Sequence, residues 1–128
     1  MAGMDDLITE ESLAALVPAF YARVRKDALI GPLFNKAIHD WDEHLGKLTA
    51  FWSSVMLTSG RYKGSPMMAH LLHVDAIKPV MFERWLEIWD ETTADMMLPE
   101  AAAAMQAKAA RIAESLQLGL SFHAQRVA

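Results

Sequence analysis

Histidine, tyrosine and tryptophan side chains are the groups in this chain best suited to chemistry. The sequence contains five His, two Tyr, four Trp and no Cys. His70 ends the segment 65–70, Ser-Pro-Met-Met-Ala-His, and is surrounded by apolar residues. A neutral imidazole nitrogen is a common metal ligand, and apolar neighbours keep water away from the bond. A lone histidine in an apolar helical segment is more often a core or surface residue, so its neighbours must decide its role.

Three more side chains could complete a site with His70. His44 lies on an apolar helical face, where it could face a ligand cavity or keep its ring tip in water. The Tyr21 phenol and the Trp85 indole could donate hydrogen bonds to a ligand with partial negative charge, or could simply pack in the core. One nitrogen ligand, two polar aromatics and an apolar cavity are the groups that hold a haem iron and a small gas ligand.

Two other arrangements of the histidines remain open. His44 and His70 could both bind one iron, which would give a six-coordinate electron-transfer site. His70 and His73, with Asp75 nearby, have the spacing of a weak zinc site, but no third His or Cys stands at motif spacing. His73 also competes with His70 as the iron ligand.

Composition limits the class of protein. A chain of 128 residues is the size of one domain, here 1–128, and needs neither a disulfide nor a structural metal to fold. Hydrophobic residues make up 53%, which argues against disorder. The net charge of −4 gives no support for nucleic-acid binding. The N-terminus lacks the pattern of a signal peptide, and no apolar run is long enough to span a membrane. We therefore expect a cytoplasmic protein.

Helical periodicity runs through almost the whole chain, and no segment alternates as a half-buried strand would. Thr9 is expected to cap the first helix, in which Pro18 predicts a kink or a junction between two segments. A short turn or helix is expected from Leu33 to near Asn35, followed by a polar loop at 38–42. Further helices are expected from Glu43 to a stop at 58–60, over 67–72, from Pro79, and from Pro99 onward, with strong helix propensity over 101–118. The result is an all-α protein of about five or six helices.

The order of these motifs resembles the truncated haemoglobins. Residues 20–27, Phe-Tyr-Ala-Arg-Val-Arg-Lys-Asp, followed by Gly-Pro-Leu-Phe at 31–34, resemble the second helix of that family and the turn after it. Residues 44–52 look like its distal helix, and the segments 67–70 and 82–86 look like its proximal segment and the next helix. Groups I and II typically carry Gly-Gly pairs. This chain has none, so it is most similar to group III, over roughly residues 9–120.

The resemblance implies a fold and a set of roles. The fold would be a truncated globin-like two-over-two helical sandwich. His70 would be the proximal iron ligand, Tyr21 and Trp85 the distal donors, and His44 the distal histidine that lines or gates the pocket. Lys47 would pair with a haem propionate, with Arg61 and Tyr62 as weaker candidates. The remaining walls and cofactor contacts would be Phe20, Phe34, Leu48, Phe51, Trp52, Met67 and Phe82.

The function implied by the resemblance is ligand binding at a haem b iron. The ligand would be oxygen, nitric oxide or peroxide, so the role could be oxygen transport or storage, a peroxidase-like activity or nitric-oxide detoxification. An unidentified reductase would be the partner, and we expect a monomer. Two other functions stay open: a bis-histidine electron carrier using His44 and His70, and an all-α interaction module without a cofactor.

Overall fold

The computed structural model describes residues 7–71, 73 and 76–127, apart from the side chains of 69, 71 and 123–127. The expectations that concern Leu72, Asp75 and the N-terminal six residues lie outside this range. The described residues form helices and no strand. The helices are α2 (Glu10–Lys26), α3 (Gly31–Ala37), α4 (Trp41–Leu57), α5 (Pro66–Leu71), α6 (Pro79–Met96) and α7 (Pro99–Val127).

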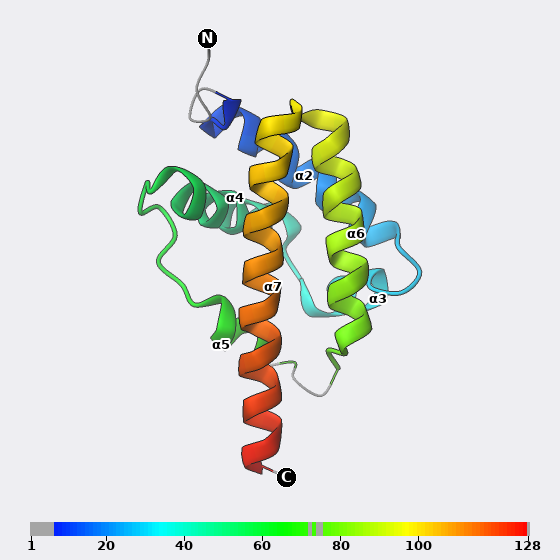
Figure 1. Cartoon of the computed structure of the whole chain (residues 1–128). Helices are drawn as coiled ribbons and strands as arrows, with labels where there is room; N and C mark the ends of the chain where they lie inside the picture. The colour runs from blue at the N-terminus through cyan, green and yellow to red at the C-terminus, as the bar shows by residue number, and fades with distance from the viewer. Residues whose placement is uncertain (1–6, 72, 74–75, 128) are drawn as a thin grey trace.

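The long helices form two layers of two. α6 and α7 lie side by side in one layer, and α2, which packs against both α4 and α6, joins that layer to the second (Figure 1). The short helix α3 packs on α2, and α5 packs on the C-terminal half of the chain through α7. α5 therefore packs on α7, whereas α4 packs on α2.

Helix α2 begins as the sequence predicts and continues through its proline. The Thr9 hydroxyl accepts a hydrogen bond from the Ser12 N–H, and the Ser12 hydroxyl accepts one from the Thr9 N–H, so each satisfies a backbone donor at the helix start. We expected either a kink or a junction at Pro18; the residue lies inside a single helix, so there is no junction. Pro18 and Ala14 are both exposed, so water can bind the Ala14 carbonyl that the proline leaves without a donor.

The starts of α4 and α3 differ from the expected positions. α4 begins at Trp41 rather than Glu43, because the Asp40 carboxylate accepts a hydrogen bond from the Glu43 N–H and caps the helix two residues earlier. α3 begins at Gly31, with Pro32 in its first turn, where proline needs no donor. Thr58, in the left-handed conformation at φ 55°, ends α4 where the sequence predicts a stop.

Prolines begin the three remaining helices, as expected for α6 and α7. α5 is the short helix predicted near Met67, beginning one residue earlier at Pro66. α7 continues to Val127, well past the strongly helical stretch that ends at Leu118.

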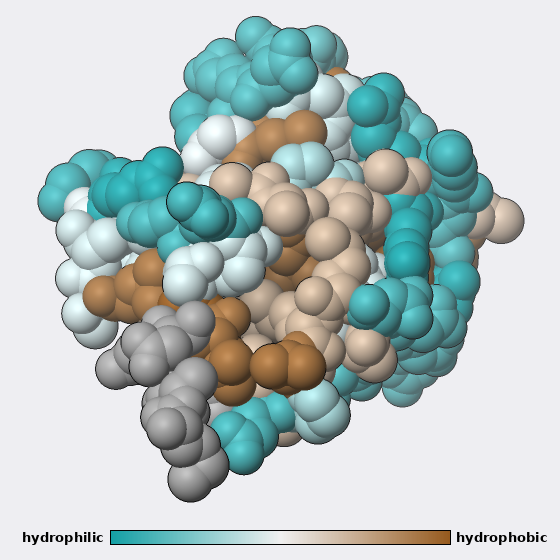
Figure 2. All heavy atoms as spheres, turned by 90° about the horizontal axis from the view of Figure 1, so that it is seen from above, coloured by the Kyte–Doolittle hydropathy of each residue, from teal (hydrophilic) through white to brown (hydrophobic). Residues whose placement is uncertain are grey.

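Most of the core lies where the two layers meet. Its largest fully buried side chains are Trp52, Trp89, Phe20, Leu13 and Leu16, which come from α2, α4 and α6. A smaller cluster of Phe82, Ala113, Leu116 and Leu120 joins α6 to α7, with Met67 of α5 packed against it. Seen from above, hydrophobic atoms also lie in the middle of the surface between hydrophilic margins (Figure 2). None of the helices in the described range is long and apolar enough to cross a membrane.

Candidate functional site

His70 is held by its own helix in one defined orientation. Its Nδ1 lies 2.6 Å from the Pro66 carbonyl oxygen, one turn earlier in α5. A carbonyl oxygen can only accept, so Nδ1 carries a proton, and in the neutral ring Nε2 keeps its lone pair. The half-buried ring lies 6.4 Å from the Phe82 ring, with 26° between the planes. Phe82 therefore supports one face of the imidazole while Nε2 is available as a ligand.

His73 lies in a different environment from His70. Its backbone N–H donates to the His70 carbonyl oxygen at 3.0 Å, and its side chain is exposed. The oriented, half-buried ring of His70 makes it the better candidate for a ligand. Among the residues that the structure describes, no cluster of three or more His, Cys, Asp or Glu could hold a metal ion.

Tyr21 and Trp85 meet although they come from α2 and α6. Tyr21 is only 3% exposed, and the Trp85 indole is its hydrogen-bonding partner. Burial raises the pKa of Tyr21 to about 12, although the hydrogen bond from Trp85 acts in the opposite direction. The phenol therefore stays protonated throughout the neutral range. Because the indole N–H can only donate, it uses the phenol oxygen as acceptor and leaves the phenol O–H able to donate elsewhere.

His44 lies between the tyrosine and the surface. Its half-buried ring is 6.3 Å from the Tyr21 ring and 5.8 Å from the Trp41 ring, edge to face in both cases. Burial lowers the pKa of His44, and the positive charges of Lys47 and of protonated His70 lower it further. The influence of His70 on this pKa means that the two imidazoles, on α4 and α5, share one region.

The apolar residues around the expected haem cavity lie at two depths. Half-buried apolar side chains from three helices pack against the core while keeping part of their surface free: Phe34, Leu48, Phe51, Met81, Trp85 and Leu86. Phe20 and Trp52 are 0% and 1% exposed, so the structure places them one layer behind, as support for the residues in front. Met67 of α5 is half-buried beside the smaller cluster.

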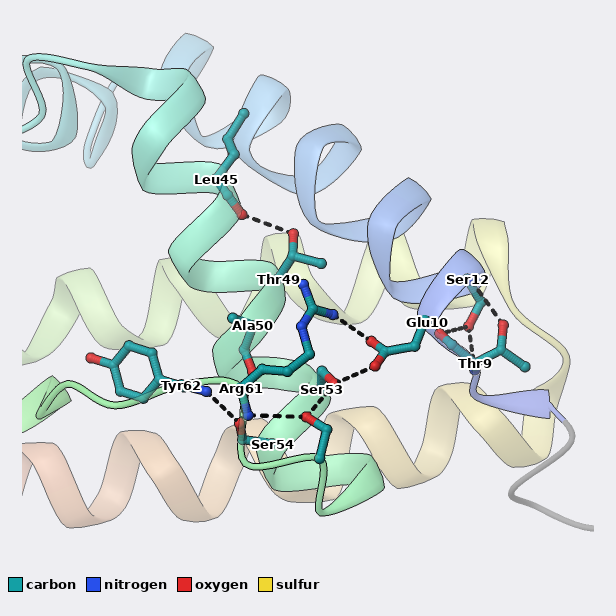
Figure 3. Close-up of polar contacts among 11 residues, drawn as sticks. Thr9, Glu10, Ser12, Leu45, Thr49, Ala50, Ser53, Ser54, Arg61 and Tyr62 are labelled. Atoms are coloured by element: carbon teal, nitrogen blue, oxygen red, sulfur yellow. Dashed lines mark hydrogen bonds and ion pairs between the residues drawn. The ribbon is translucent and has the colours of Figure 1, made fainter.

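The three expected partners of a propionate differ in position. Lys47 forms an exposed ion pair with Glu43 at 3.1 Å, one turn from His44. Arg61 instead reaches Glu10 at the start of α2, at 2.7 Å (Figure 3). Tyr62 packs its ring on Phe51 with the centroids 5.3 Å apart. Of the three, Lys47 is the one whose charge acts on the pKa of His44.

Figure 3 shows the polar cluster around Arg61. The Ser53 hydroxyl, fully buried in α4, is hydrogen-bonded to the Glu10 carboxylate at 2.8 Å and to Ser59 at 2.6 Å. The Tyr62 N–H donates to the Ser54 hydroxyl at 2.8 Å. These bonds fix the loop after α4 to both α4 and α2.

Trp41 packs beside Tyr21 and His44, a position that the sequence analysis did not predict. Its ring lies 6.0 Å from the Tyr21 ring, and the Arg25 guanidinium lies 4.5 Å from the Trp41 ring centroid. Trp41 precedes His44 by one helical turn, and that spacing was the signal available in the sequence. The expected loop at 38–42 obscured it.

A separate groove lies between the start of α6 and the C-terminal half of α7. Its volume is about 420 Å³, and its walls are Pro79, Ala110, Glu114, Gln117, Leu118 and Ser121. None of these side chains is a ligand that a haem iron prefers, and the groove is distinct from the region shared by His44 and His70.

Comparison with known proteins identifies the family. No family model matches the chain. A group 3 truncated hemoglobin from Campylobacter jejuni is 38% identical over 91 residues, which cover 68% of this chain and 71% of that protein. The crystal structure of the group III truncated hemoglobin from Campylobacter jejuni superposes with a TM-score of 0.82 at 35% identity, covering 91% of this chain and 94% of that one.

The chain belongs to the group III truncated haemoglobins. The predicted family and the two-over-two helical fold are thereby confirmed. α2 and α4 form one layer of this truncated haemoglobin, and α6 and α7 form the other. Membership of the family implies a haem cofactor.

The residues present in this truncated haemoglobin fit a haem group. The Nε2 of His70 is free to bind iron because Nδ1 is held by the Pro66 carbonyl. The phenol of Tyr21 is buried, protonated and hydrogen-bonded to Trp85. Partly free apolar surfaces from α3, α4 and α6 would contact a flat apolar ring.

Proposed function

We propose that this truncated haemoglobin binds haem through His70 and holds a small oxygen-containing ligand beside Tyr21. The observation that supports this most directly is the Tyr21–Trp85 contact, because it keeps a protonated phenol donor deep in the core. Further support comes from His44, whose ring lies beside Tyr21 and whose pKa is lowered by the charge of His70. A bound haem supplies an iron that carries the small ligand.

His70 is the proposed proximal ligand. Donation from Nδ1 to the Pro66 carbonyl fixes the tautomer and leaves the Nε2 lone pair available to the iron. Phe82 limits rotation of the ring from one side. The imidazole would therefore bind without first reorienting.

Tyr21 is the proposed donor to the ligand, and Trp85 positions it. Trp85 donates to the phenol oxygen, which directs the phenol hydrogen away from Trp85. A ligand oxygen with partial negative charge would accept that hydrogen, a bond worth about 1–3 kcal/mol. The proposal therefore gives the two predicted donors different tasks: Tyr21 donates to the ligand, and Trp85 orients Tyr21.

The ligand class follows from the donor. A phenol hydrogen bond stabilises bound dioxygen and also polarises bound peroxide, so oxygen binding, peroxide reduction and nitric-oxide handling share the same groups. The cofactor is proposed to be haem b, because a chain without Cys cannot form the thioether links of c-type haem. A separate reductase would return the iron to the ferrous state.

His44 supports a second candidate function. Its lowered pKa keeps the ring neutral near pH 7, and it shares a region with His70. A neutral His44 could bind the iron opposite His70, which would make the protein a six-coordinate electron carrier. The alternative role is to line the pocket, where protonation at acid pH would favour movement of the charged ring toward water.

Absorption spectra of the protein titrated with haem test the main proposal. Wild type should develop a Soret band with one equivalent of haem, and His70→Ala should lose the high-affinity fraction. His73→Ala is the matched control, since it removes an exposed imidazole three residues away, and it should bind haem like wild type. Loss of binding in His73→Ala alone would reassign the ligand.

The same spectra separate the two candidate functions. A five-coordinate ferrous spectrum in wild type supports an open ligand position. A six-coordinate ferrous spectrum that becomes five-coordinate in His44→Ala supports the electron carrier. No Soret band in wild type would contradict both and leave the cofactor-free module.

A further inference from the structure

Five of the six tryptophan and tyrosine side chains lie along one row of aromatic rings. The chain has four Trp and two Tyr. The row begins with Tyr21 and Trp85, continues through Trp89 and Trp52, and ends at Tyr62 in the loop after α4, which Phe51 connects to Trp52. Trp41, the sixth of these residues, lies beside Tyr21 and outside the row.

The three indoles of the row are stacked nearly parallel. The Trp85 and Trp89 rings are 5.7 Å apart with 4° between their planes. The Trp89 and Trp52 rings are 4.5 Å apart with 17° between their planes. Aromatic pairs more often meet edge to face or offset, and the other contacts of Trp85 and Trp89, with Phe20, are edge to face. Stacking brings the π systems of three easily oxidised side chains into contact.

The two ends of the row differ in exposure. Tyr21 lies in the proposed ligand site, and Trp85 contacts it directly. At the other end Phe51 bridges Trp52 and Tyr62, with ring centroids 5.6 Å and 5.3 Å away. Tyr62 is half-buried, so its ring also reaches the surface. The hydrogen bonds drawn in Figure 3 hold the loop that carries Tyr62 against α4, through Ser54, and against α2, through Glu10.

We propose that this row carries electrons from the surface at Tyr62 to the ligand site when a hydroperoxide is reduced there. The inference rests on the proposed function, because a hydroperoxide must react at the haem. It goes further in naming the route and the residue that exchanges electrons with outside donors.

The chemistry balances with an external donor. Reducing a hydroperoxide breaks its O–O bond, takes up two electrons and two protons, and releases an alcohol and water. Each electron leaves Trp85 and is replaced in turn from Trp89, Trp52 and Tyr62. Tyr62 loses its phenolic proton to water and becomes a neutral radical. A one-electron donor such as a phenol or ascorbate then restores the tyrosine, twice per hydroperoxide.

Burial gives the transfer its direction. Trp52 and Trp89 are 1% and 0% exposed, and a positive charge on a buried indole is unfavourable in a dry core. The Trp89 N–H donates to the Met105 carbonyl oxygen at 3.1 Å, which eases a passing charge but offers no base to take the proton. Tyr62 can lose its proton to water, so the oxidised site is most stable there.

Electron paramagnetic resonance and peptide mapping of the haem-loaded protein test this route. After a pulse of hydrogen peroxide without donor, wild type should show a tyrosyl radical and oxidation or dityrosine cross-linking at Tyr62. In Trp89→Phe the Tyr62 signal should be lost while the Soret band is retained. Trp41→Phe is the matched control, because it removes an indole outside the row, and it should keep the Tyr62 signal.

A second variant covers the case in which Trp89→Phe does not fold. Tyr62→Phe leaves the stacked core intact, and its radical should change from tyrosyl to tryptophanyl. A tyrosyl signal unchanged in Tyr62→Phe, or undiminished Tyr62 oxidation in a folded Trp89→Phe, would overturn the route. If peroxide is consumed but oxidation stays at Tyr21 and Trp85, only this inference fails. If haem binds but peroxide does not react, this inference also fails while haem and oxygen binding stand. If haem does not bind, the proposed function fails with it.

Discussion

The two sides of the proposed ligand site are held in different ways. Tyr21 and Trp85 come from α2 and α6, helices of 17 and 18 residues that cross the centre of the core. His70 comes from α5, a helix of six residues that packs on α7 and orients its imidazole through its own Pro66 carbonyl. The side that carries Tyr21 and Trp85, the donor side, therefore depends on the packing of the whole domain, whereas the side that carries His70 depends on local bonds. Substitutions on the donor side should lower the free energy of unfolding. Substitutions on the His70 side should mainly weaken haem retention.

Truncation of Phe20, on the donor side, should cause the largest loss in the free energy of unfolding. Its ring is fully buried against Tyr21, Trp85 and Trp89. Phe20→Ala should lower the free energy of unfolding by about 3–5 kcal/mol, because it removes apolar contacts and leaves a cavity. Urea denaturation of the haem-free protein measures this.

His70→Ala is the comparison on the opposite side. It should change the same free energy by less than about 1 kcal/mol, because the ring is only half-buried. Equal losses in the two variants would mean that α5 is as central to the fold as α2.

Tyr21→Phe should act on the ligand rather than on the fold. It keeps the ring and removes the phenol O–H, so bound oxygen should dissociate faster by roughly 5- to 150-fold, corresponding to about 1–3 kcal/mol. Stopped-flow displacement of oxygen measures the rate. Trp85→Phe should show a smaller increase, because it only releases the orientation of the phenol. Tyr62→Phe removes the other tyrosine hydroxyl of the chain and should change the rate much less.

The donor side should also lose stability in acid through Asp27. This carboxylate follows α2 and accepts hydrogen bonds from the Leu29 and Ile30 N–H groups and from Arg84 of α6. Burial raises the pKa of Asp27, but the hydrogen bonds from Ile30, Arg84 and Leu29 outweigh it, so the pKa lies below its ordinary value.

The sign of this dependence follows from linkage. A carboxyl whose pKa is lower in the folded state contributes stability above its unfolded pKa of about 3.9, and that contribution is lost as the pH falls through the folded pKa. Asp27→Asn should reduce stability on the order of 1 kcal/mol at pH 7, and the difference should disappear in acid. Denaturation midpoints between neutral and acid pH measure it. Asp95→Asn, at an exposed ion pair with Arg23, should show little pH dependence.

The smallest expected effect is on the His70 side, at Gly119. A Cβ at this position of α7 would meet the end of the Met67 side chain of α5. Met67 is flexible and can move, so Gly119→Ala should stabilise α7 by about 0.5–1 kcal/mol through helix propensity. The displaced Met67 should loosen α5 and speed haem loss to apomyoglobin. Slower haem loss would show that α5 tolerates the methyl group.

Much of the fold was predictable because the helix signals are local. Thr9 marks a helix start through its side-chain hydroxyl, and Pro79 and Pro99 mark helix starts through their fixed φ and missing N–H. Thr58 and Gly60 lie in the predicted stop. The start of α4 was missed because the sequence at Asp40 is compatible with either a loop residue or a helix cap. The structure identifies the cap, since the Asp40 carboxylate accepts a hydrogen bond from the Glu43 N–H. Pro18 suggested an interruption, but its exposed position on α2 lets the helix continue.

The candidate site was predictable only in part. The residue types at positions 21, 44, 70 and 85 were found from sequence, and the structure brings them to one region from α2, α4, α5 and α6. The sequence assigned Phe20 and Trp52 to the cavity wall, whereas burial places them one layer behind. Trp41 was missed because its helix was expected to begin after it.

The sequence by itself determined the helical periods, most of the helix boundaries and the chemistry available at each position, because these depend on neighbours within a few residues. It also carried the family resemblance through the order of its motifs. Only the tertiary structure decided that Trp85 donates to Tyr21, that Pro66 orients His70 while His73 stays exposed, and that three indoles stack. Those outcomes depend on how α2, α4, α5 and α6 pack, since contacts between residues far apart in the chain are set by packing.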